Sequence, residues 1–180
     1  MASELRAILA DIELLQSLDD EARSRIAEVG RVEHWQDGAV VLEEGAFGPR
    51  MMVILQGRVA ILRRDSGGVQ RVITSLGEGD VLGEMSLLLD LPRTASVHAV
   101  GALQVFAIDR SAFWNLIEAD DPVFLRLGFE LSRVLARRLM ALNQQVIELL
   151  AEDEGLRRRF GDARQELFEL WDPALDQGKG

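Results

Sequence analysis

One stretch constrains the fold more than any other, the segment from Gly83 to Val97 that reads GEMSLLLDLPRTASV. Its apolar residues allow one or two helical turns, and Pro92 ends them because its ring disfavours helical geometry at the preceding residue. From Thr94 onward polar and apolar side chains alternate, which is the period of a half-buried strand. The stretch therefore predicts a turn, a short helix, a second turn and a strand.

The same stretch carries the groups of a small anion site. Free N–H groups at the start of the short helix, around Met85 and Ser86, favour a phosphate in front of them. Arg93 can donate to two phosphate oxygens, and Thr94 adds a hydroxyl beside it. Glu84 has the wrong charge for phosphate but is an acceptor suited to a sugar hydroxyl. These groups together suit a compact nucleotide that carries one negative charge.

An ordered series of motifs resembles the cyclic nucleotide-binding domain family. The sequences GEMSLL and PRTASV are similar to the family's phosphate-binding cassette, here residues 82–97, and the likeness extends over about residues 12 to 145. The other motifs correspond to the family's early strand, glycine turn, central hairpin and pre-cassette turn, at residues 38–41, 44–48, 51–59 and 76–80. Any one glycine turn is a weak signal, but the ordered series is specific.

The resemblance implies roles for individual residues. Glu84 would accept from the ribose 2′-hydroxyl, Arg93 would bind the cyclic phosphate, and the backbone at Gly83 would approach the ligand. Thr94 is compatible with cAMP and with cGMP, and the bacterial character of the other motifs favours cAMP. In the family a C-terminal helix reaches the base, and this implies that Asn143 pairs with a base edge; the alternative is a solvated or interhelical amide.

The rest of the chain predicts an α+β fold, a β-roll of jelly-roll type with N-terminal helices and a long C-terminal helical extension. We expect N-terminal helices in residues 1–30, with Asp19 capping the second, the nucleotide-binding roll in 31–109 and C-terminal helices in 110–180. The predicted strands, separated by glycine-rich turns, are Arg31–Trp35, Val40–Glu43, Met51–Gln56, Arg58–Arg64, Val69–Ser75, Thr94–Val100 and Leu103–Ile108.

After a short helix over Arg110–Glu118, a long helix is predicted to begin at Asp121 and Pro122. Its apolar residues step by four and three, as at the a and d positions of a coiled coil: Leu135, Leu139, Leu142, Val146 and Leu149. We expect homodimerisation through this seam; the alternative is packing on the barrel of the same chain. An acidic amphipathic helix is predicted over Leu156–Trp171, with Arg157–Arg159 on a solvated face.

Composition excludes several classes of function. The formal charge of −10 disfavours nonspecific nucleic-acid binding. A helix-turn-helix module needs roughly 60 residues, whereas 30 follow Leu150, so DNA binding is not expected. No segment reads as a membrane span or signal peptide, and the lack of cysteine fits a reducing cytoplasm. His34 and His98 have no clustered co-ligands, and no catalytic triad can be assembled, so neither a metal site nor an enzyme is expected.

The sequence thus predicts a cytoplasmic cyclic nucleotide sensor that binds cAMP, or cGMP, in the roll and signals through its C-terminal helices to a protein partner or a second copy. One alternative is an interaction module or regulatory subunit that keeps the barrel without binding nucleotide. Another is the sensor part of a larger transcription regulator. The presence of both Glu84 and Arg93 favours the sensor.

Overall fold

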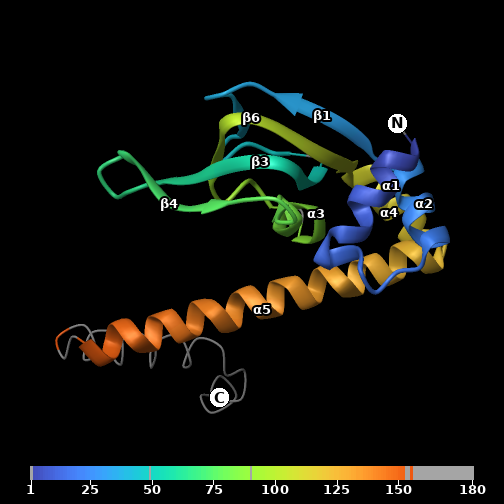
Figure 1. Cartoon of the computed structure of the whole chain (residues 1–180). Coiled ribbons are helices and arrows are strands. Elements are labelled where there is room, and N and C mark those ends of the chain that lie inside the picture. The colour runs from blue at the N-terminus through green and yellow to red at the C-terminus, as the bar shows by residue number, and fades with distance from the viewer. Residues whose placement is uncertain (1, 49, 90, 153–154, 156–180) are drawn as a thin grey trace, which may run out of the picture. The chain divides into compact units, whose positions relative to one another are not determined.

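The computed structural model describes residues 2–48, 50–89, 91–152 and 155 (Figure 1). Contacts within the chain define two compact units, Met1–Ser132 and Arg133–Gly180. The sheet and the cassette belong to the first unit, and the long helix α5 (Pro122–Glu152) begins there and continues into the second. The helix predicted over Leu156–Trp171 and the basic run Arg157–Arg159 lie outside the described residues.

The N-terminal region is helical, as predicted, but it is broken into three pieces: α1 (Ala2–Asp11), the 3-10 turn η1 (Glu13–Leu15) and α2 (Asp20–Val29). The carboxylate of Asp19 accepts from the backbone N–H of Ala22 at 2.8 Å. This bond satisfies one of the free donors at the start of α2 and confirms the predicted cap.

All strands pair antiparallel in one sheet of order β1-β6-β3-β4, with β2 on β6 and β5 on β3. The strands are β1 (Arg31–Trp35), β2 (Val40–Leu42), β3 (Arg50–Arg64), β4 (Gln70–Leu76), β5 (Val81–Leu82) and β6 (Ser96–Asp109). This arrangement, with helices beside it, confirms the α+β β-roll. In Figure 1, α1, α2 and α4 gather where β1 begins and β6 ends.

The prediction of separate strands on either side of two glycines was wrong. Residues 51–56 and 58–64 form the single strand β3, so the expected central hairpin is absent from these described residues, and β6 likewise continues through Gly101. Gly57 and Gly101 have positive φ values of 96° and 76°. A Cβ atom at Gly57 would overlap the carbonyl oxygen of Ala102 in β6. The glycines therefore mark matching kinks in two paired strands, with the register shifted at Gln56, rather than chain reversals.

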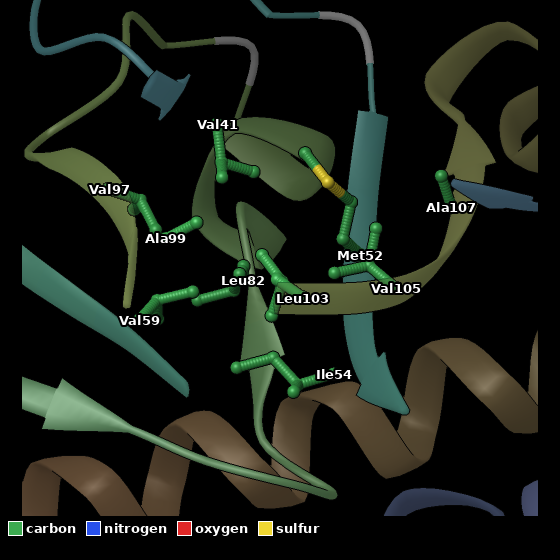
Figure 2. Packing of buried hydrophobic residues seen from close by; sticks show 10 residues of the cluster. All are labelled: Val41, Met52, Ile54, Val59, Leu82, Val97, Ala99, Leu103, Val105 and Ala107. Atoms are coloured by element: carbon green, nitrogen blue, oxygen red, sulfur yellow. The ribbon is translucent and has the colours of Figure 1, made fainter. Parts of the chain in front are cut away.

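The core lies inside the roll. Figure 2 shows ten buried side chains from β2, β3, β5 and β6 pointing toward one another. The two-residue strand β5 was not predicted, yet both of its side chains are buried. Burying a leucine such as Leu82 contributes roughly 1.5–3 kcal/mol. Because Leu82 directly precedes Gly83, the core fixes the point where the cassette begins.

The helices after the sheet begin where they were predicted to begin. The first is α4 (Arg110–Glu118). At the start of α5 the carboxylate of Asp121 accepts from the backbone N–H groups of Val123 at 2.9 Å and Phe124 at 3.3 Å. The rings of Phe113 in α4 and Phe124 in α5 pack edge to face with centroids 6.0 Å apart. Of the helices described, none is long and apolar enough to cross a membrane.

Candidate functional site

The candidate site is built on α3 (Glu84–Leu89), the short helix predicted after Gly83. Gly83 has a φ of 73°, in the left-handed region that favours glycine. Its carbonyl oxygen accepts from the backbone N–H of Leu87 at 3.1 Å, which is a first-turn hydrogen bond of α3. This glycine thus turns the chain from the core into the helix.

The side chain of Arg93 reaches back to the start of α3 and is only 4% exposed. Its Nη1 donates to the carbonyl oxygen of Gly83 at 3.1 Å, and its Nη2 donates to the carbonyl oxygen of Arg50 at 2.6 Å. The third group, Nε, is also buried and has no acceptor among the described residues. The main chain therefore holds the guanidinium, while its Nε–H has no acceptor within the described ranges.

Two glycines make room for this guanidinium. A Cβ atom on Gly48 would overlap Nε of Arg93, and one on Gly83 would overlap Nη1. The backbone of Arg93 is itself fixed, because its N–H donates to the carbonyl of Ala46 and its carbonyl accepts from Gly45, each at 2.9 Å. The glycine turn at 44–48 and the cassette thus form one structure.

The charges near Arg93 have opposite effects on its pKa. Burial lowers the pKa of Arg93, and the positive charge of Arg50 lowers it further, whereas the charge of Glu84 raises it. Glu84 is 6% exposed, so its carboxyl group is buried close enough to the guanidinium to interact with it. A buried cation that is only partly compensated is stabilised by an anion that can reach it.

The other predicted binding residues differ in their exposure and in the compact unit to which they belong. Ser86 is buried at 5% exposure in α3, while Met85 and Thr94 are exposed. Asn143 lies on α5 in the second compact unit, with an exposed side chain. Its contact with a base, like the ligand roles of the cassette residues, stays a prediction.

Sequence reasoning missed two residues that support the cassette. Arg50 supplies a carbonyl to Arg93 from the first position of β3. Trp114 in α4 donates its indole N–H to the carbonyl oxygen of Leu87 at 2.8 Å. Neither contact is local in sequence, so no sequence motif indicates it. The position of Arg50 directly after a Gly-Pro pair marks only the start of a strand.

No group of three histidine, aspartate or glutamate side chains in the described part of the chain could hold a metal ion. The chemistry of this site is that of a buried arginine and a buried carboxylate beside a short helix. Such a pair can bind a ligand with one anionic group and neighbouring hydroxyls.

A family model described as the cyclic nucleotide-binding domain matches residues 32–120, which include the cassette and all of the roll except Arg31. These residues belong to the cyclic nucleotide-binding domain family. The family predicted from the cassette motifs is therefore confirmed.

Relatives and structures of this family resemble the chain over most of its length. A CRP-like cAMP-activated global transcriptional regulator of Mycobacterium tuberculosis is 32% identical over 146 residues, which are 81% of this chain and 63% of that protein. The regulatory domain of Toxoplasma gondii PKA, solved with cAMP, is 25% identical with a TM-score of 0.62, covering 73% of this chain and 50% of that chain.

A cyclic nucleotide-binding domain from Methylobacillus flagellatus shows the same fold. Its TM-score is 0.72 at 21% identity, covering 82% of this chain and 83% of that chain. These relatives are named as regulators and binding domains rather than catalysts. The chain spans less than two thirds of the length of the curated relatives that it matches first.

Proposed function

We propose that this domain is a cyclic nucleotide sensor that binds cAMP at the cassette and signals through its C-terminal helices. The observation that carries the proposal is the state of Arg93. Its guanidinium is buried, is held by two backbone carbonyls and has an Nε–H group with no acceptor in the described structure. A cyclic phosphate supplies both the missing acceptor and the missing negative charge.

The neighbouring groups support a nucleotide rather than a bare anion. Glu84 is buried beside Arg93 and would repel a free phosphate, but it can accept hydrogen bonds from a ribose hydroxyl. Thr94 is exposed next to Arg93, whose guanidinium is the proposed phosphate clamp, and fits either cAMP or cGMP. The relatives named above favour cAMP, since one is activated by it and another was solved with it.

The second unit would supply the output. Three residues of the predicted seam on α5 remain largely exposed: Leu139 at 59%, Leu142 at 55% and Leu149 at 58%. Apolar side chains in a coiled-coil pattern favour pairing with another helix, and we propose a second copy of α5 as that partner. Asn143, which directly follows the seam residue Leu142, would contribute its amide to the base or to the paired helix.

One alternative function has an observation in its favour. The same exposed seam would serve an interaction module that binds a partner protein whether or not nucleotide is present. In either case the domain is regulatory rather than catalytic, as its relatives are. We place it in the cytoplasm because a chain without cysteine has no disulfide to form.

The deciding experiment is calorimetric titration of the purified, nucleotide-free protein with cAMP and then with cGMP. We expect saturable binding of cAMP, and a loss of about a hundredfold in affinity for Arg93→Ala, because a buried charged hydrogen bond is removed. Binding that survives this substitution would place the ligand elsewhere. A folded wild-type protein that binds neither nucleotide would favour the interaction module.

A further inference from the structure

Four charged side chains form a cluster beside the cassette, at the ends of β1, β3 and β6. Arg31 bonds Asp109 through both terminal nitrogens, at 2.5 and 3.2 Å. One oxygen of Glu33, Oε1, accepts from Arg31 at 2.9 Å and from Arg50 at 2.5 Å. Two cations and two anions therefore cancel within the cluster.

The two arginines of this cluster depend on Glu33 to different degrees. Arg31 keeps the two bonds to Asp109 if Glu33 is removed. For Arg50, Glu33 is the one ion-pair partner within the described ranges. Substitution of Glu33 would therefore leave the charge of Arg50 without a bonded counterion.

Arg50 connects the cluster to the phosphate clamp. Its carbonyl oxygen accepts from Nη2 of Arg93 at 2.6 Å. Its charge is also close enough to lower the pKa of Arg93, in addition to the lowering caused by burial. Any change in the net charge at Arg50 therefore changes the electrostatic potential where the phosphate would bind.

Net charge at the clamp distinguishes two classes of nucleotide. A cyclic phosphodiester carries one negative charge, whereas a phosphomonoester such as 5′-AMP carries about 1.5 to 2 at neutral pH. An additional uncompensated cation attracts the more highly charged ligand more strongly. Neutralising a second cation at this site would therefore favour the cyclic ligand.

We propose that Glu33 is a specificity-determining residue: by neutralising Arg50 it keeps a single effective positive charge at the clamp and so favours a cyclic phosphodiester over a 5′-phosphomonoester. The proposal rests on the proposed function, since it concerns the ligand of the same cassette. Glu33 does not touch the ligand in this scheme; it acts through Arg50.

The test compares the dissociation constants of cAMP and 5′-AMP for the wild type, three variants and a control variant at low and high salt. In Glu33→Gln the affinity for 5′-AMP relative to cAMP should rise roughly threefold at low salt, and the rise should shrink at high salt because ions screen the charge. Arg50→Gln, which keeps the backbone carbonyl, should move the ratio the opposite way. The double variant should return close to the wild-type ratio.

Glu28→Gln is the matched control, because Glu28 pairs with Arg25 on α2 and should leave the ratio unchanged. An unchanged ratio in Glu33→Gln would overturn the proposal, as would a change that is insensitive to salt or that persists in the double variant. If Glu33→Gln does not fold, a ratio that fails to move in Arg50→Gln overturns it. Wild-type protein that binds no cyclic nucleotide would instead refute the proposed function.

Discussion

The indole N–H of Trp114 donates to the carbonyl oxygen of Leu87 at 2.8 Å, so that α4 is bonded to the last turn of the cassette helix. The carbonyl groups at a helix end have no partner within the helix, and this indole satisfies one of them. The guanidinium of Arg110 lies 5.5 Å from the centre of the Trp114 ring. The bond joins α3 to the helix that follows the sheet, and the ring contact within α4 holds the indole in place.

We expect Trp114→Phe to lower the free energy of unfolding by about 1 kcal/mol, because the carbonyl of Leu87 loses its donor. Trp35→Phe is the control, since the buried Nε1 of Trp35 has no acceptor among the residues described. It removes a similar volume without removing a hydrogen bond. Denaturant titration of both variants checks the prediction, and equal losses in the two would contradict it.

Glu84 should determine discrimination against a ligand that lacks the 2′-hydroxyl. If its carboxylate accepts from ribose, the wild-type protein should bind 2′-deoxy-cAMP about tenfold or more weakly than cAMP. Glu84→Ala should bind both ligands with similar affinity, and Glu84→Gln should keep part of the difference. Competition binding measures these ratios. Undiminished discrimination in Glu84→Ala would assign the ribose contact to another residue.

Gly83→Ala should be more harmful than the same substitution at Gly79. Both glycines have positive φ, 73° and 86°, but a Cβ atom at Gly79 meets nothing within 4 Å, whereas one at Gly83 would overlap Arg93 and crowd the carbonyl oxygen of Arg50. We expect a loss of about 1 kcal/mol for Gly79→Ala.

For Gly83→Ala we expect a loss of about 2 kcal/mol or more, because displacement of neighbouring atoms adds to the backbone strain. Its affinity for cAMP should also fall, since Arg93 must move. Thermal unfolding and calorimetry check the two effects. Equal losses of stability and affinity in the two variants would show that the space beside Arg93 contributes to neither property.

The exposed seam of α5 predicts the oligomeric state. Leu139→Asp with Leu142→Asp should convert a dimer into a 20.0 kDa monomer, because charges at a and d positions oppose helix pairing. Ala141→Asp, at an exposed c position away from the seam, should leave the mass unchanged. Light scattering at several concentrations measures the mass. A dimer that persists in the double variant would exclude the seam as the interface.

Asp109 should contribute to the loss of stability in acid. The hydrogen bonds from Arg31 lower the pKa of Asp109, against the opposing effect of its partial burial. A carboxylate with a lowered pKa in the folded state adds stability above its unfolded pKa, and that stability is lost as the pH falls below about 4.

Asp109→Asn should therefore be less stable than wild type at pH 7, and the difference should shrink as the pH falls toward about 3. Asp11→Asn, at an exposed position on α1, serves as the control. Urea unfolding at several pH values supplies the comparison. A difference that stays constant over this range would rule out the ion pair as its cause.

The parts of the fold that depend on local chemistry could be predicted from the sequence. Asp19 and Asp121 cap helices with their own side chains, and Pro92 ends a helix through its own ring, so each signal is complete within a few residues. The continuity of β3 through Gly57 could not be predicted in this way. It depends on a matching kink in β6, which is distant in the sequence.

The same distinction applies to the site. Gly83, Glu84 and Arg93 lie within one motif, and their proximity follows from the short helix α3 and the return of the chain after it. The support from Arg50 and Trp114 depends on how strands and helices approach one another. The presence of a charged or aromatic residue in a single sequence does not predict such a long-range contact. The role of Asn143 depends on the placement and pairing of α5. The sequence around Asn143 determines neither.

Both acceptors that hold Arg93 are main-chain carbonyls, at positions 50 and 83. Replacing the side chain of Arg50 therefore leaves its acceptor in place, whereas Gly83 tolerates little change. Position 50 and its partner Glu33 can thus be varied in a library to alter ligand preference while the guanidinium keeps its anchor. New ligand preferences are therefore to be sought at the residues behind Arg93, whose side chains do not supply its acceptors, rather than at Gly83 or Arg93.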